Sequence, residues 1–181
     1  SPEVVIGDNG DNTFFASGDI ELFAGLRGND TVSYASARAG VTANLGNPLS
    51  NRGEATLDLY VDIENLIGSQ FNDKLTGNSG DNVLEGGAGN DVLVGGTNGA
   101  GGDTASYANA TAGGTVTLAT TSAQNTVGAG TDTLSGFENL LGSAFGDVLT
   151  GTTGNNILIG LAGADELNDG AEADTLIGGA G

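Results

Sequence analysis

The sequence contains no cysteine and no histidine, and it has only 4 lysine and arginine residues against 23 aspartate and glutamate residues. The first absence excludes zinc sites of the usual kinds, histidine-based catalytic triads, cysteine nucleophiles and disulfides. The net charge of −19 argues against nucleic acids and anionic membranes as partners, because both attract clustered lysine and arginine. No apolar run approaches the roughly 20 residues that a membrane span needs.

The chain is rich in glycine, with 34 residues, and its apolar fraction is 38%. Acidic chains poor in aromatic residues are often disordered, but here Val, Leu and Ile recur in short regular bursts, which argues against disorder. A hard cation can hold many carboxylates in a folded chain, and oxygen ligands suit Ca²⁺. The composition therefore favours a folded chain that binds calcium.

A nine-residue period runs through much of the sequence, as in GGAGNDVLV at 86–94. Further units begin at positions 7, 16, 25, 68, 77, 142, 151, 160 and 169, and the unit at 95–106 is stretched by three residues near Asn98. Fixed periods of this kind predict a solenoid.

A longer repeat lies over the short one. DTVSYA at 30–35 recurs as DTASYA at 103–108, and ENLIGS at 64–69 recurs as ENLLGS at 138–143. The sequence thus predicts one solenoid over residues 1–181. Its nonapeptide runs lie at about 7–33, 68–106 and 142–181, and related inserts at about 34–67 and 107–141 join them.

The composition of the nine-residue unit explains its shape. Six glycine-rich residues permit positive φ and close backbone approach, so they predict a turn, and three residues with a central apolar side chain predict a short strand. The central residues predicted to point into the core are Val32, Leu75, Leu84, Leu93, Leu149, Leu158, Leu167 and Leu176. One apolar residue in nine is too few to offset the ordering of the chain, so the coil needs a further source of stability. Calcium fits between stacked turns, where carbonyl and carboxylate oxygens converge.

Units written Gly-Gly-x-Gly-x-Asp-x-U-x, with U a large apolar residue, resemble the repeats-in-toxin (RTX) calcium-binding nonapeptide family. Several consecutive units in three separate runs carry this resemblance. It implies an all-β fold, namely a right-handed parallel β-roll or β-helix solenoid with several calcium ions in its turns. It also implies a secreted or cell-surface bacterial protein, exported by type I secretion and folding on calcium outside the cell.

The resemblance further implies that calcium lies between turns two units apart, bound by sixth-position side chains and backbone carbonyls. Carried onto this chain, it pairs Asn12 with Asp30, Asp73 with Asp91, Asn82 with Asp103, Asp147 with Asp165 and Asn156 with Asp174, while Glu21 has no clear partner. Sites with a neutral Asn should bind more weakly. The fifth-position side chains Asp11, Asn29, Asn72, Asp81 and Asn90 are further metal-site candidates.

The inserts carry a less specific signal. Asp58 and Asp132 stand at the sixth position of degenerate nonapeptide units, where they are either calcium ligands or turn-forming residues. Tyr34 and Tyr107 are expected in the core. Glu64 and Glu138 recur with the long repeat, which favours a structural role over a pair of catalytic carboxylates. Phe71 and Phe145 replace a fourth-position glycine, which predicts reshaped turns or caps.

These features predict a non-enzymatic structural module of a surface layer, filament or adhesin. The alternative is a folding and secretion module attached to a secreted enzyme such as a metalloprotease or lipase. Binding of ice would need a regular ladder of Thr or Asn, which the outward positions do not show. Neither end of the sequence shows an obvious polar cap, so each end is expected either to associate end to end with another copy or to stack on neighbouring repeats of the same protein.

Overall fold

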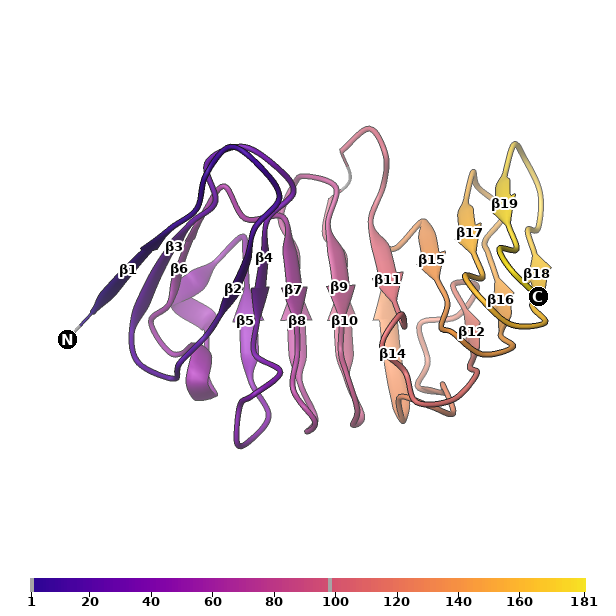
Figure 1. The fold of residues 1–181 in the computed structure, drawn as a ribbon. Coiled ribbons are helices and arrows are strands. Elements are labelled where there is room, and N and C mark those ends of the chain that lie inside the picture. Colours follow the sequence, from indigo (N-terminus) through magenta and orange to yellow (C-terminus); the bar gives the residue numbers. More distant parts are fainter. Residues whose placement is uncertain (1, 98) are drawn as a thin grey trace.

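The computed structural model describes residues 2–97 and 99–181, so Ser1 and Asn98, the latter in the stretched unit, lie outside the described residues. Short strands that follow one another along a single stack of coils make up the fold (Figure 1). The strands are β1 (Glu3–Ile6), β2 (Thr13–Phe15), β3 (Glu21–Ala24), β4 (Thr31–Ser33), β5 (Thr42–Asn44), β6 (Leu59–Val61), β7 (Asn65–Ile67), β8 (Lys74–Thr76), β9 (Val83–Glu85), β10 (Val92–Val94), β11 (Thr104–Ser106), β12 (Thr115–Thr117), β13 (Gln124–Asn125), β14 (Thr131–Ser135), β15 (Asn139–Leu141), β16 (Val148–Thr150), β17 (Ile157–Ile159), β18 (Glu166–Asn168) and β19 (Thr175–Ile177). Two single-turn 3-10 helices, η1 (Pro48–Ser50) and η2 (Gly53–Ala55), lie in the first insert.

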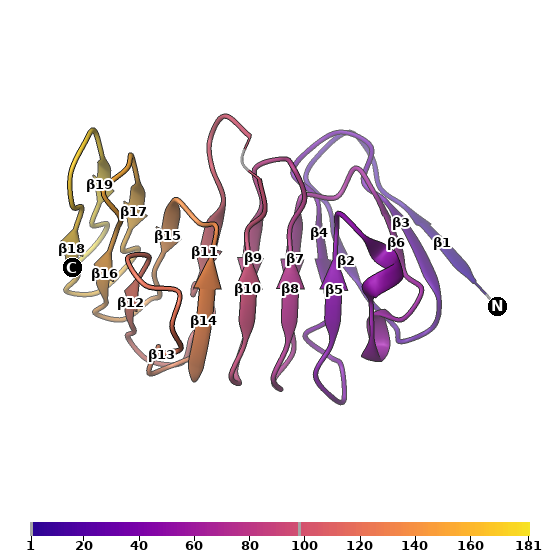
Figure 2. The same cartoon turned by 180° about the vertical axis from the view of Figure 1, so that it is seen from behind.

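The strands form two layers. One layer is a single 8-stranded parallel sheet in the order β19-β17-β15-β11-β9-β7-β4-β2. The opposite layer, which faces the viewer in Figure 2, consists of three sheets with the orders β1-β3-β6, β13-β14-β10-β8-β5 and β12-β16-β18. Apart from the antiparallel pair β13–β14, the strand pairs are parallel. This arrangement confirms the predicted all-β, parallel β-roll.

The register stacks the central apolar residue of each strand on its equivalent one coil later. Leu75 lies opposite Leu93 in the pair β8–β10, and Leu140 lies opposite Leu158 in the pair β15–β17. The resulting columns form the core between the two layers. Of the predicted core residues, Val32, Leu75, Leu84, Leu93, Leu149 and Leu158 are fully buried.

The prediction of an inward, buried side chain is wrong for Leu176, which is 44% exposed, and Leu167 is only half-buried. Both residues belong to the last coil that the structure describes, β18 and β19. Strand β19 has a bonded neighbour on one side only, so no described strand covers its other edge. The exposure of Leu167 and Leu176 therefore follows from their place at the end of the described stack.

Each insert places its strands of the second layer in reversed chain order. After β4, the chain forms β5, which pairs with β8 further along the roll, and then returns to form β6, which pairs with β3. The second insert does the same, since β12 pairs with β16 whereas the later β14 pairs with β10. The alternating apolar residues of the inserts predicted strands there, but they did not predict this order, which divides the second layer into three sheets.

Within the described chain, no helix has the length and apolar character required to cross a membrane.

Candidate metal sites

The sixth-position side chains form hydrogen-bonded ladders along the turns. The backbone N–H of Asp73 donates to Oδ1 of Asp91 at 2.8 Å, and that of Asp147 donates to Oδ1 of Asp165 at 2.9 Å. The same contact joins Asn12 to Asp30, Asn82 to Asp103 and Asn156 to Asp174. The structure therefore places each of these residues beside the partner that the resemblance implies.

Several of these carboxylates have one oxygen without a partner. Within residues 2–97 and 99–181, the buried side-chain oxygens that lack any hydrogen bond are Oδ2 of Asp30, Asp91, Asp103 and Asp165. A buried, unpaired carboxylate oxygen is costly because it has lost its water and gained nothing in return. These oxygens therefore mark places where a cation fits.

The turns are of two kinds, which differ at the second position of the unit. In the closed turns, the N–H of the second residue donates to the sixth side chain, as Ser69 does to Asp73 Oδ2 at 2.5 Å and Ser143 to Asp147 Oδ2 at 2.6 Å. The closed turns belong to the units at 7–15, 16–24, 68–76, 77–85, 142–150 and 151–159. In the open turns the second residue has a positive φ, and these units are 25–33, 86–94, 95–106, 160–168 and 169–177. Each unpartnered oxygen lies in an open turn.

Glycines leave room for oxygen atoms that converge on their missing side chains, as the open turn of the unit at 86–94 shows. A Cβ on Gly86 would overlap Oδ2 of Asp91, and a Cβ on Gly87 would overlap the carbonyl oxygen of Ser69, one coil earlier. Gly89 has a φ of 135°, and its Cβ would lie 2.7 Å from the carbonyl oxygen of Phe71. Calcium takes roughly six to eight oxygen ligands from carboxylates and carbonyls, so this set of atoms fits the ion.

Phe71 and Phe145 occupy the fourth position of closed turns, where their φ is not positive. Their side chains are exposed. Gly80 and Gly154, at the fourth position of other closed turns, likewise have no positive φ, so these closed turns share this feature whether a glycine or a phenylalanine occupies the position.

Asn82 and Asn156 each lie one coil after a three-residue turn, and a backbone carbonyl of that turn points toward the asparagine side chain. The N–H of Glu64 donates backwards to the carbonyl of Asp30 at 3.1 Å, and the Glu64 carbonyl accepts from Nδ2 of Asn82 at 2.6 Å. The second copy repeats this geometry, because Nδ2 of Asn156 donates to the carbonyl of Glu138 at 2.6 Å. A carboxylate cannot donate, so an amide is the side chain that this position requires. The expectation of weak calcium ligands did not include this role.

Asp58 and Asp132 have both carboxylate oxygens engaged by the protein. Asp58 Oδ1 accepts from the N–H of Glu21 at 2.9 Å, which gives Glu21 its partner, and Oδ2 accepts from the Tyr34 hydroxyl at 2.7 Å. Asp132 Oδ1 accepts from the N–H of Asp91 at 2.9 Å, and Oδ2 accepts from the Tyr107 hydroxyl at 3.2 Å. Tyr34 and Tyr107 are buried in the core. These contacts favour structural roles for both aspartates.

The fifth-position side chains form a separate ladder nearer the solvent. Oδ1 of Asp11 accepts from the N–H of Asn29 at 2.9 Å, and Oδ1 of Asn72 accepts from the N–H of Asn90 at 2.9 Å. Asp81 accepts from the N–H groups of Gly101 and Gly102, and Asn90 accepts from Thr131. The structure therefore gives these candidates hydrogen bonds to the next coil.

Glu64 and Glu138 take the place of the sixth-position residue in two turns of only three residues, 62–64 and 136–138, where sequence analysis placed no ligand. Oε2 of Glu64 accepts from the N–H of Asp30 at 2.8 Å, and Oε2 of Glu138 accepts from the N–H of Asp103 at 2.9 Å. The longer side chain of glutamate suits the shorter turn. The available signal was their position directly before the strands β7 and β15.

Burial also changes the acidity of the sixth-position groups. It raises the pKa of Asp91 to about 7, against the lowering effect of the Asp73 N–H, and the neighbouring Asp132 carboxylate adds to the rise. Burial likewise raises the pKa of Asp73 and of Asp103. In the described chain no group of three or more acidic side chains is placed to hold a metal ion by itself, so an ion in these turns would need backbone carbonyls as well.

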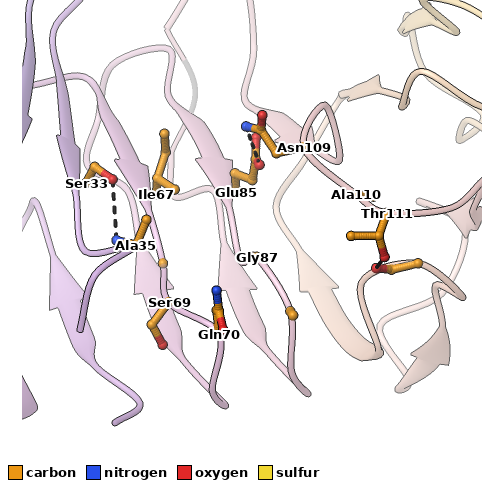
Figure 3. A pocket seen from close by; sticks show the side chains of 13 residues that line it. Ser33, Ala35, Ile67, Ser69, Gln70, Glu85, Gly87, Asn109, Ala110 and Thr111 are labelled. Carbon is orange, nitrogen blue, oxygen red and sulfur yellow. Dashed lines mark hydrogen bonds between the residues drawn. The ribbon is translucent and has the colours of Figure 1, made fainter. Parts of the chain in front are cut away.

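A surface pocket of about 560 Å³ lies beside Glu85, between the loops around Ser69 and Asn109 (Figure 3). One Glu85 carboxylate oxygen accepts from Nδ2 of Asn109 at 2.8 Å, and the other accepts from the Ser106 hydroxyl at 2.8 Å. Glu85 is the acidic residue of the lining, and both of its oxygens are engaged in holding the loop. The pocket therefore presents no pair of acidic groups for acid–base chemistry.

Comparison with protein-family models finds the RTX calcium-binding nonapeptide repeat in four copies, over residues 2–32, 67–105, 141–176 and 159–181. No curated protein matches the chain. The matched residues include both the closed and the open turns of all three runs.

Replacing Asn82 by Asp should destabilise the roll at saturating calcium. The substitution removes the hydrogen bond from Asn82 Nδ2 to the Glu64 carbonyl and places a negatively charged carboxylate beside that carbonyl oxygen. We expect a loss of about 1–3 kcal/mol in the free energy of unfolding, measured in urea. The exposed Asn9→Asp is the matched control and should change little. A gain of one bound calcium ion in Asn82→Asp, with no loss of stability, would show instead that Asn82 weakens a metal site.

With calcium chelated, acidification should favour the folded state. The folded-state pKa of Asp91 is about 7, above the unfolded value of 3.8, so its contribution to stability is complete below about pH 4 and is lost as pH rises through 7. We expect the strand signal in far-UV circular dichroism to grow as pH falls from about 8 to 5 in chelator. At saturating calcium the signal should already be high at pH 7.5. A strand signal that falls on acidification in chelator would contradict this.

Proposed function

The chain belongs to the RTX calcium-binding nonapeptide repeat family, and on that premise we propose that it is a structural module which folds on calcium outside the cell. RTX repeats form calcium-binding β-roll modules, typically of secreted proteins. We place this module in a secreted or cell-surface bacterial protein, such as a surface layer, a filament or an adhesin, exported by type I secretion. Its role there is that of a spacer that becomes rigid when calcium binds.

The unpartnered carboxylate oxygens of the open turns carry this proposal. They are buried, and they recur in all three runs of the roll. The chain around them has a net charge of −19. Without a cation, desolvation and mutual repulsion of these carboxylates oppose folding, and bound calcium offsets both. Binding free energy at such sites is therefore also folding free energy.

A structural role is supported by what the polar side chains do. Buried hydroxyl, amide and carboxylate groups bond to the backbone or to one another along the stack, as Asn82 and Asp58 do. The pocket beside Glu85 has its acidic group fully engaged. Strand after strand extends the stack in one direction, which suits a spacer (Figure 1).

The proposal is tested by folding in chelator and then in millimolar Ca²⁺, with Mg²⁺ at the same concentration as the control. We expect far-UV circular dichroism to show an unfolded chain in chelator and a strand spectrum with Ca²⁺, because calcium is the ion that takes many oxygen ligands in flexible geometry. A strand spectrum that is the same with chelator and with calcium would refute the coupling of calcium to folding.

We also propose that the folded module associates end to end. The first strand exposes Val4 and Ile6, and the last strand exposes Leu176 and Ile177. Strands β1 and β19 each have a bonded neighbour on one side only, so their free backbone groups can pair with another copy.

Light scattering across a calcium titration checks this association. We expect the mass to rise above that of the monomer as calcium binds, because the ion both folds the terminal strands and reduces the charge repulsion between copies. Replacing Leu176 by Lys should reduce the rise without reducing the strand signal. A folded species that stays monomeric at high protein concentration and saturating calcium would contradict the proposal.

A further inference from the structure

The end of the first nonapeptide run meets the first insert at a group of oxygen atoms, one of which has no partner in the protein. Asp30 is 0% exposed, and its Oδ2 has no hydrogen-bond partner. A Cβ on Gly25 would overlap both Asp30 Oδ2 and the carbonyl oxygen of Asp62, so these two oxygens converge on one point. Asp62 begins the three-residue turn that ends at Glu64, whose carboxylate lies 2.8 Å from the N–H of Asp30.

The end of the second run repeats this arrangement with different residues. Asp103 is 0% exposed, and its Oδ2 is also unpartnered. A Cβ on Gly95 would overlap the carbonyl oxygen of Gly136 and would lie 2.8 Å from Asp103 Oδ2. Gly136 begins the other three-residue turn, and the carboxylate of Glu138 lies 2.9 Å from the N–H of Asp103. Two segments far apart in the sequence thus build the same site.

The closed turns show why these oxygens need a ligand from the next coil. In a closed turn Asp73 Oδ2 receives the N–H and the hydroxyl of Ser69, so the protein itself satisfies that oxygen. In the unit at 25–33 the second residue is Leu26, with a φ of 77°, and in the unit at 95–106 it is Gly96, with a φ of 127°. Neither has a hydroxyl, and the carboxylate that follows stays unpaired.

We propose that calcium binds at both junctions between a run and an insert, with Glu64 and Glu138 as ligands. At the first junction the ion is held by Asp30 Oδ2, the Asp62 carbonyl and the Glu64 carboxylate. At the second it is held by Asp103 Oδ2, the Gly136 carbonyl and the Glu138 carboxylate. Both glutamates lie outside the residues that match the nonapeptide repeat. The inference rests on the proposed calcium-dependent function and adds the Glu64 and Glu138 carboxylates as ligands at two of its open-turn sites.

The chemistry of the group agrees with calcium. Each junction offers two carboxylates and one carbonyl from two successive coils, which is an all-oxygen set with net negative charge. The carboxylate of Glu138 is close enough to Asp103 to raise the pKa of that group further, beyond the rise that burial causes. A bound cation relieves this repulsion, and it ties the short turn to the run before it.

The test counts bound calcium ions in the native chain, Glu64→Gln, Glu138→Gln and the double variant, by equilibrium dialysis and calorimetric titration. Glutamine keeps an oxygen that accepts the N–H of Asp30 or Asp103, so the substitution removes charge but not the hydrogen bond. The matched control is Glu166→Gln, because Glu166 is exposed on β18. We expect each single variant to lose one ion, or to bind it at least tenfold more weakly, and the double variant to lose two.

The outcomes separate this inference from the proposed function. A native chain that binds no calcium would overturn both. A native chain that binds calcium, together with a double variant of unchanged stoichiometry and affinity, would overturn only the junction sites. If one single variant fails to fold at saturating calcium, the other copy decides. The dependence of the melting temperature on calcium concentration gives a second count, which should be shallower in both single variants and unchanged in Glu166→Gln.

Discussion

The roll depends on carboxylates that are buried in its turns and that, in the open turns, the protein satisfies only by half. One oxygen of each sixth-position aspartate accepts a backbone N–H from the coil before it, which fixes the stacking of the coils. The other oxygen is satisfied by Ser69 or Ser143 in closed turns, by Tyr34 or Tyr107 in the inserts, and by no protein group in open turns. The second residue of the unit determines whether a turn is closed, with the oxygen satisfied, or open, with the oxygen unpartnered. The residue at that single position therefore determines whether a turn leaves a carboxylate oxygen free for a cation.

Much of the fold could be predicted from the sequence because the period of nine places one apolar residue at the centre of each short strand. Leu75, Leu84 and Leu93 are buried as the period requires. The pairs of sixth-position residues also follow from spacing, since stacked coils bring together residues one coil apart. Such predictions need only the alternation of side chains along a strand and the repeat length.

The remaining features depend on the direction of individual peptide groups, which composition does not reveal. From the sequence, Asn82 is expected to be a weak calcium ligand in place of an aspartate. Its role as a donor depends on the carbonyl of Glu64, which faces it in the structure. Glu64 has no glycine-rich turn to mark it, because three residues replace six. The return of β6 to pair with β3 depends on how the whole insert packs, and its apolar pattern would fit either order. Sequence periodicity therefore predicts the regular coils better than the junctions between them.

The reversed strand order in the inserts has a mechanical consequence. Strand β5 lies in the sheet of the second run, whereas β6, later in the chain, lies in the sheet of the first. A plane that separates these two runs must cross the connection between β4 and β5 and also the one between β5 and β6. Tension applied along the roll is then shared, at this plane, by more than one segment of the polypeptide chain. The inserts accordingly join neighbouring runs by several covalent crossings, whereas successive coils within a run are joined by one.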